Sequence, residues 1–166
     1  MQETHWIETG MPGIKRDPET LLPVIVDEEE AEGLLQGDDP CDAVVVLIAR
    51  GQLRQAAELV ADVRLNEPQN IRMRLLDTDL QRAMGNTEAA IKRLRALLEE
   101  FSGTSHEATM HQYLGILYYN AGDLTAARHR FEKALELHTR ANALERRTEL
   151  ARRSLQAVER HEHLVR

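Results

Sequence analysis

The chain has 166 residues, a formal net charge of −7 and 42% hydrophobic residues, and this length suits one domain. Cys41 is the only cysteine, so an internal disulfide is excluded and a reducing compartment is indicated. No apolar run approaches the ~18 residues that span a membrane, and the first residues lack the pattern of a signal peptide. We therefore expect a cytoplasmic protein without membrane insertion.

The charge is concentrated at one end of the chain. Residues 1–40 hold eleven of the 28 acidic residues but only two of the 21 basic ones, so they carry −9 and the remainder carries +2. Phosphate binding needs a basic stripe. The distribution therefore argues against nucleic acid as the main partner.

Residues 1–36 are predicted to form an acidic, proline-containing arm. Prolines and glycines interrupt residues 1–26, which show little helical periodicity, so we expect no regular structure there. Within this arm, the apolar run 21–26 could belong to a disordered tail, pack on its own chain or bind a partner. The acidic stretch 27–30 predicts the start of a short helix that ends near Gln36.

The next segment predicts two packed helices. The first runs from about Asp39 to Arg50, with Pro40 tolerated in its first turn. Its apolar side consists of Ala43, Val44, Leu47 and Ile48. The second helix carries Ala56, Leu59, Val60 and Val63 at helical spacing.

A second pair of helices follows, and its second member has the clearest apolar face in the chain: Ala90, Ile91, Leu94, Leu97, Leu98 and Phe101. Its first member is irregular, because Asp77 lies at a position expected to be buried, and an unpaired buried carboxylate costs several kcal/mol. We favour a rotated helix in which Leu76, Leu80 and Met84 face inward. The alternative is that Asp77 pairs with an arginine.

Residues 108–137 predict a third pair, and its residues suggest how the two helices pack. Gly115 lies within a helix, where glycine costs roughly 1 kcal/mol, which a close approach to Ala127 would justify. Gly122 is expected to end the first helix in the left-handed conformation. Asp123 is expected to cap the second.

The three pairs repeat one pattern. Gly51 with Ala56, and Gly85 with Ala90, reproduce the turn of Gly122 with Ala127, at steps of 34 and 37 residues. The longer step fits an insertion around residues 102–105. The residues assigned to packing within the repeats are Gly51, Ala56, Gly85, Ala90, Leu114, Gly115, Tyr118, Gly122, Ala127, Phe131 and Ala134.

This pattern resembles the tetratricopeptide repeat, in which a Leu-Gly-x2-Tyr motif is followed by Ala-x3-Phe over 34 residues. Here His111 replaces the usual tryptophan and Thr139 the usual proline. The resemblance implies an all-α fold, a right-handed superhelical stack of three repeats at 37–70, 71–107 and 108–139. Residues 140–166 would then form a C-terminal capping helix and tail.

The C-terminal helix is expected over residues 141–159. It has a narrow apolar stripe of Ala141, Leu144, Thr148, Ala151, Leu155 and Val158. On the other side lie Arg146, Arg147, Arg152, Arg153 and Arg160. We favour a helix that caps the stack with a polar outer face. A dimerising coiled coil is the alternative.

No catalytic constellation, metal site or cofactor motif is evident, so we expect a protein that is not an enzyme. The string His161-Glu162-His163 suits a flexible tail more than a fixed metal site. His111 is expected to be a packing residue. Cys41 has no adjacent basic residue that would lower its pKa.

In the resembled family, the first helices of the repeats line a concave groove that holds a peptide or a helix. Carried over, the groove residues are Cys41, Val45, Ile48, Arg72, Leu75, Asp79, Arg82, Thr109, Gln112, Ile116, Tyr119 and Asn120. Cys41, Val45 and Leu76 stand where the chaperone-binding carboxylate-clamp subfamily needs polar residues, so we exclude that subtype. We hypothesise that the acidic-apolar segment 21–30, or a similar segment of a partner, covers this groove and pairs with Arg72 and Arg82.

Two functional classes follow from these expectations. The first is an adaptor or chaperone-like protein that binds a protein or peptide partner in its groove. The small acidic chaperones of type III secretion are similar in size and stack three such repeats before a final helix. The second is an assembly subunit that oligomerises through its C-terminal helix, and a monomer in solution would favour the first.

Overall fold

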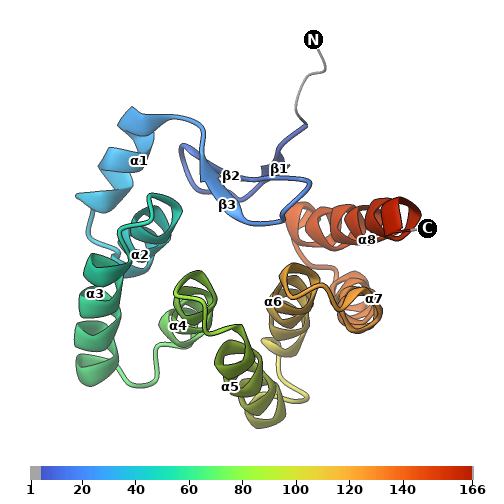
Figure 1. The fold of residues 1–166 in the computed structure, drawn as a ribbon. Helices are drawn as coiled ribbons and strands as arrows, with labels where there is room; N and C mark the ends of the chain where they lie inside the picture. Colours follow the sequence, from blue (N-terminus) through green and yellow to red (C-terminus); the bar gives the residue numbers. More distant parts are fainter. Residues whose placement is uncertain (1–4, 166) are drawn as a thin grey trace.

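The computed structural model describes residues 5–165, which form a three-stranded sheet followed by eight helices (Figure 1). The strands are β1 (Ile7–Glu8), β2 (Ile14–Arg16) and β3 (Pro23–Ile25). The helices are α1 (Glu28–Leu35), α2 (Pro40–Ala49), α3 (Leu53–Asn66), α4 (Ile71–Ala83), α5 (Thr87–Glu100), α6 (Glu107–Asn120), α7 (Leu124–Arg140) and α8 (Glu145–Val165). The fold is thus mostly helical, as expected, with a small sheet that was not.

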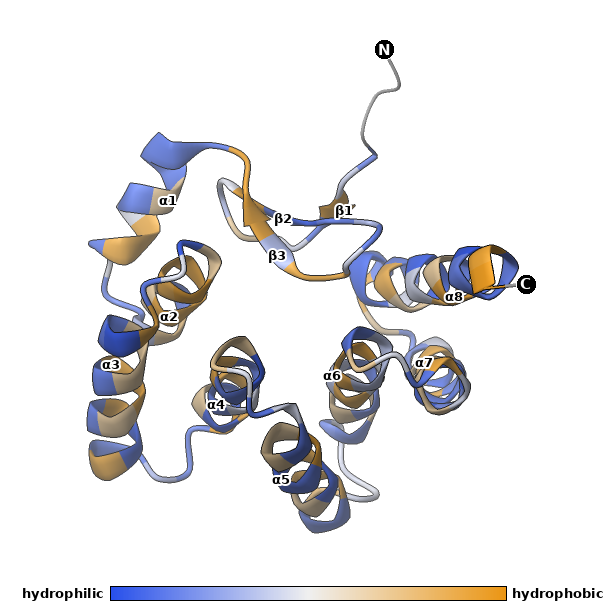
Figure 2. Cartoon of the chain, viewed as in Figure 1, coloured by the Kyte–Doolittle hydropathy of each residue, from blue (hydrophilic) through white to orange (hydrophobic). Residues whose placement is uncertain are grey.

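Helices α2 to α7 form three pairs that follow one another around an arc (Figure 1). In this view α2, α4 and α6 lie on the inner side and α3, α5 and α7 on the outer side. Each inner helix also contacts the next inner helix. Figure 2 shows that most residues of α2, and those around β3, are hydrophobic. No helix in residues 5–165 is long and apolar enough to cross a membrane.

The inner helices end in the same way, which explains the repeated glycines. Gly51, Gly85 and Gly122 have φ angles of 74°, 88° and 85°, the left-handed conformation expected after a helix. In each case the residue after the glycine donates its N–H to a carbonyl five positions earlier, for example Asp123 to Tyr118 at 3.0 Å. The Asp123 side chain also accepts from the N–H of Ala126, which confirms its capping role.

The helices α6 and α7 approach closely at Gly115. A Cβ atom placed on this glycine would lie 2.5 Å from Cδ1 of Phe131, inside any tolerable contact. The expectation of a close helix approach is correct, and the ring of Phe131 makes the contact. Ala127 and Phe131 are both fully buried in the same cluster.

The N-terminal arm has regular structure, so the prediction of an irregular arm was wrong. The strands pair antiparallel in the order β1-β2-β3, with Ile7 opposite Arg16 and Ile14 opposite Ile25. Glycine is required at residue 13, just before β2, because its φ is 76° and a Cβ would lie 2.7 Å from the carbonyl oxygen of Asp27 at the start of α1. The short helix predicted after residue 27 is confirmed as α1, capped by the side chain of Asp27.

The sheet connects both ends of the arc. Ile14 packs in the cluster formed by α1, α2, α3 and α4, whereas Ile7 and Leu21 pack with α6, α7 and α8. Leu21 is fully buried even though its φ of 64° is unusual for a residue with a side chain. Of the three alternatives for the apolar run 21–26, packing on its own chain is the one observed for Leu21.

Asp77 is buried and paired, so the preference for a rotated helix was wrong. Its Oδ2 accepts from Arg64 at 2.5 Å and from Arg93 at 3.1 Å, and the residue is 6% exposed. Leu76 and Leu80 are buried as expected, but Met84 is 48% exposed. The helix buries most of its circumference, so a paired carboxylate replaces the apolar residue of the repeat pattern.

The last helix begins later and ends later than the stripe predicted. Ala141 belongs to the end of α7, Asn142 has a left-handed φ of 51°, and Leu144 is 54% exposed before α8 begins at Glu145. Asparagine therefore ends α7 in the way that glycine ends the inner helices. The buried face of α8 consists of Thr148, Ala151, Ser154, Ala157 and Val158.

The arginines of α8 are not all on an outer face. Arg153 donates to the carbonyl of His5 at 2.6 Å, and Arg160 donates to that of Pro18 at 3.0 Å. Arg146 and Arg147 line a cavity described below. The expectation that the arginines form a polar outer face is therefore wrong for these four side chains.

Candidate functional site

A cavity of about 660 Å³ lies between the inner helices, the start of α8 and the sheet. Volumes of this order are typical of ligand-binding pockets. Seven of the twelve predicted groove residues line it: Val45, Arg72, Leu75, Asp79, Thr109, Gln112 and Ile116. The inner helices therefore bring together residues from all three helix pairs.

The other five predicted groove residues lie outside this lining. Cys41 is buried, and burial raises the pKa of its thiol. Ile48 packs against the cluster of α2 and α3. Arg82 pairs with Asp79 of its own helix. Tyr119 donates its hydroxyl to the carbonyl of Glu19, and Asn120 donates to that of Thr20 at 3.2 Å, so both anchor the turn before β3.

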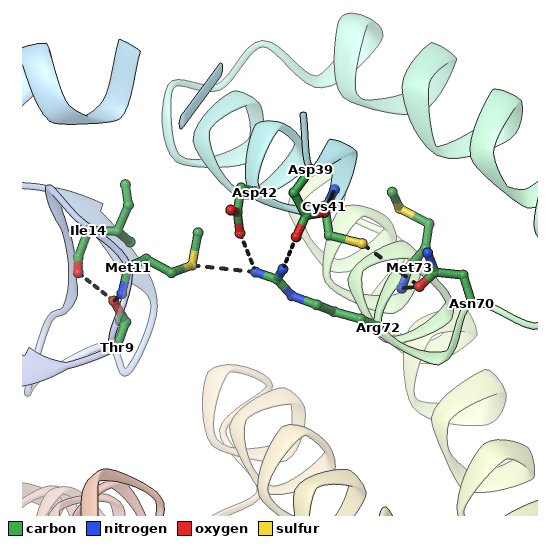
Figure 3. A network of polar contacts seen from close by, with 9 residues as sticks. All are labelled: Thr9, Met11, Ile14, Asp39, Cys41, Asp42, Asn70, Arg72 and Met73. Carbon is green, nitrogen blue, oxygen red and sulfur yellow. Dashed lines mark hydrogen bonds and ion pairs between the residues drawn. The ribbon is translucent and has the colours of Figure 1, made fainter. Parts of the chain in front are cut away.

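Arg72 connects α4 to α2 and to the sheet (Figure 3). Its guanidinium donates to Asp39 at 3.0 Å and to Asp42 at 2.7 Å, and it contacts the Sδ atom of Met11 at 3.6 Å. Burial lowers the pKa of Arg72, but the hydrogen bond and charge of Asp42 outweigh it and the pKa is raised. Arg72 is therefore a fixed cation with two carboxylate partners.

The predicted pairing between the acidic arm and the groove arginines was wrong. Arg72 binds aspartates of its neighbouring helix, and Arg82 binds Asp79 at 2.7 Å in its own helix. Glu28 of the arm instead pairs with Arg50 at 3.1 Å. The arm does form one wall of the cavity, through the segment 8–12, two residues of β2 and Pro23 of β3.

Gln112 is the most buried polar side chain of the lining that lacks a full set of partners. It is 3% exposed, and its Nε2 donates to Oγ of Ser154 at 2.9 Å. Ser154 in turn donates to the carbonyl of Leu150 at 2.7 Å. The Oε1 atom of Gln112 has no hydrogen-bond partner among the described residues. A buried acceptor without a donor is uncommon and requires an explanation.

Basic side chains also line the cavity. Arg16 of β2 lies over the ring of Tyr113 at 5.8 Å and donates to the carbonyl of Leu21 at 2.8 Å. Arg146 and Arg147 are exposed and so lie at the rim. His138 is buried nearby, and burial together with the charge of Arg147 lowers its pKa.

Sequence reasoning missed the cavity residues contributed by the sheet, by α7 and by α8. Among them are the segment 8–12, Arg16, His138, Arg146, Arg147 and Leu150. The sequence predicted the start of this helix at residue 141, so it did not place Arg146 and Arg147 in the first turn, where cations are disfavoured. No local pattern connects them to a strand about 130 residues away.

The cavity offers apolar surface, ion pairs and hydrogen-bonding groups, which are the components of a binding site. Among residues 5–165, no group of three or more His, Cys, Asp or Glu side chains is placed to hold a metal ion. A scan against protein-family models, a search of the curated proteins and a search of the solved structures each found no match.

Proposed function

We propose that this chain is a tetratricopeptide-like protein that binds a peptide segment of a protein partner, without catalysis, in the cavity on its inner face. The observation that carries the proposal is the cavity itself, which collects lining residues from α2, α4, α6 and α8. Helical-repeat proteins use concave surfaces of this kind for recognition. The three helix pairs, each with the same glycine-ended inner helix, support the assignment to this repeat class.

The second functional class, an assembly subunit that oligomerises through residues 140–166, has less support. The predicted stripe residues Thr148, Ala151 and Val158 are buried within the chain, so they are not free to form a coiled coil. Sedimentation of the purified protein separates the two classes. A monomer supports the adaptor, and a dimer that dissociates when α8 is altered supports the assembly subunit.

A random peptide library displayed on phage and selected on the immobilised full chain tests the binding function. Thr109 lines the cavity and is half-buried, so Thr109→Trp should fill part of it. Ala96 is exposed on α5 and outside the cavity, so Ala96→Trp is the matched control. We expect T109W to weaken the selected peptides at least about tenfold and A96W to leave them unchanged.

Two outcomes would contradict this function. One is the absence of any enriched peptide on the wild-type chain. The other is unchanged binding to T109W, with circular dichroism showing that the variant is folded. Both variants should be compared with the wild type by thermal unfolding before their affinities are interpreted.

A further inference from the structure

The carboxylates around the cavity already have basic partners. Asp39 and Asp42 both bind Arg72, at 3.0 and 2.7 Å. The other two also pair, Glu8 with Lys15 at 2.5 Å and Asp79 with Arg82 at 2.7 Å. Each of these carboxylates therefore has a basic partner within the protein, although Asp39 and Asp42 share one arginine.

Three arginines of the same lining have no carboxylate partner among residues 5–165: Arg16, Arg146 and Arg147. Arg16 comes from the sheet and the other two from α8. The guanidinium of Arg146 lies against Gly10, where a Cβ atom would be 3.0 Å from its Cζ. The sheet and the last helix thus bring unpaired cations to one cavity in a protein whose net charge is −7.

Local stability does not account for Arg146 and Arg147. They lie in the first turn of α8, where the helix dipole favours anions and disfavours cations. Neither side chain makes an ion pair with the described residues that would offset this effect. Residues that contradict a local preference without a structural gain are expected at functional sites.

Gln112 provides an independent observation. Gln112 lines the same cavity, and its buried Oε1 needs an N–H donor that the described residues do not supply. Leaving such a group unpaired is unfavourable, because the group has lost its contact with water and gains no hydrogen bond in return. A ligand that supplies both an N–H donor and an anion would satisfy the orphaned amide oxygen and the three arginines together.

We propose that the cavity binds an acidic peptide segment, with a carboxylate at Arg16, Arg146 and Arg147 and a main-chain N–H donating to Oε1 of Gln112. The inference rests on the proposed function and names the chemistry of its ligand. The site differs from a groove formed by repeat helices alone, because β2 and α8 supply its cations. Charge-assisted bonds to arginine are among the strongest available to a carboxylate.

The test is a double-mutant cycle between protein and peptide. Peptides selected on the wild-type chain should be enriched in Asp and Glu. Replacing the critical Glu by Gln should weaken wild-type binding at least about tenfold, and should have little further effect on the doubly substituted R146Q/R147Q protein. The control R54Q/R140Q makes the same change in net charge at two exposed arginines outside the cavity.

The outcomes separate the inference from the proposed function. Two results would overturn the acidic-peptide inference and leave the binding function standing. One is enrichment of apolar peptides without acidic residues, and the other is an equal loss of peptide affinity in R54Q/R140Q. Failure to select any peptide would overturn both. A third result would show a phosphate site and would also overturn the carboxylate assignment. In that case millimolar inorganic phosphate competes with the peptide, and the Glu-to-Gln change in the peptide leaves its affinity unchanged.

Discussion

Two glycines within helices differ in the space around them, so we expect replacement by alanine to have opposite effects on stability. A Cβ atom on Gly33 of α1 would have nothing within 4 Å, whereas one on Gly115 would lie 2.5 Å from Cδ1 of Phe131. Gly33→Ala should stabilise by about 0.5–1 kcal/mol through helix propensity. Gly115→Ala should destabilise by about 1–3 kcal/mol, because overpacking outweighs propensity. Urea unfolding measures both, and a stable G115A would contradict the close packing.

A second residue-scale prediction concerns Asp77, the buried carboxylate held by Arg64 and Arg93. Asp77→Asn keeps the size of the side chain but removes its charge. We expect a loss of about 1–3 kcal/mol, since charge-assisted hydrogen bonds become weaker neutral ones. Asp38 is exposed in the loop before α2, so Asp38→Asn is the control and should be neutral. Equal unfolding free energies for the two variants would mean that the arginine pairs contribute nothing.

At the scale of elements, the sheet depends on contacts with helices that lie far along the chain. Leu21 is its most deeply buried anchor, in the cluster of α6, α7 and α8. Leu21→Ala should cost about 2–5 kcal/mol and should release residues 5–26 from protection against hydrogen exchange. Val26 is 41% exposed, and Val26→Ala should change little. Retained protection in L21A would show that other contacts hold the sheet.

Local and distant contacts also explain what the sequence could predict. Helices α1 to α7 were predictable because caps and apolar periodicity act within a few residues, as at Asp27 and Gly122. The strands have two or three residues each and are held by partners such as Arg153, which is 148 positions from His5. The boundary before α8 was missed because an asparagine adopts the conformation that glycine adopts elsewhere. The cavity arginines were unpredictable for the same reason as the sheet that faces them.

At the scale of the whole molecule, a buried histidine makes stability depend on pH. Burial and the charge of Arg130 lower the pKa of His111 below 6.5, despite the nearby carboxylate of Glu107. The unfolded chain therefore binds a proton more readily, and stability falls as pH drops below about 6.5.

Thermal unfolding between about pH 8 and about pH 5.5 measures this dependence. His111→Gln should flatten the curve below the unfolded pKa, whereas His129→Gln, at an exposed position, should not. An unchanged pH dependence in H111Q would assign the effect to other groups, of which His138 is the first to examine because its pKa is also lowered.

The sheet that packs on both α1–α2 and α8 also fixes how many helix pairs the chain can hold. In an open array each pair interacts only with its neighbours, so pairs can be added or lost and the ends can fray independently. Here Ile14 contacts the first part of the array and Ile7 the last. A duplicated pair would carry α8 out of reach of the strands. The molecule should therefore unfold in one cooperative transition, because destabilising either end of the array also destabilises the other end.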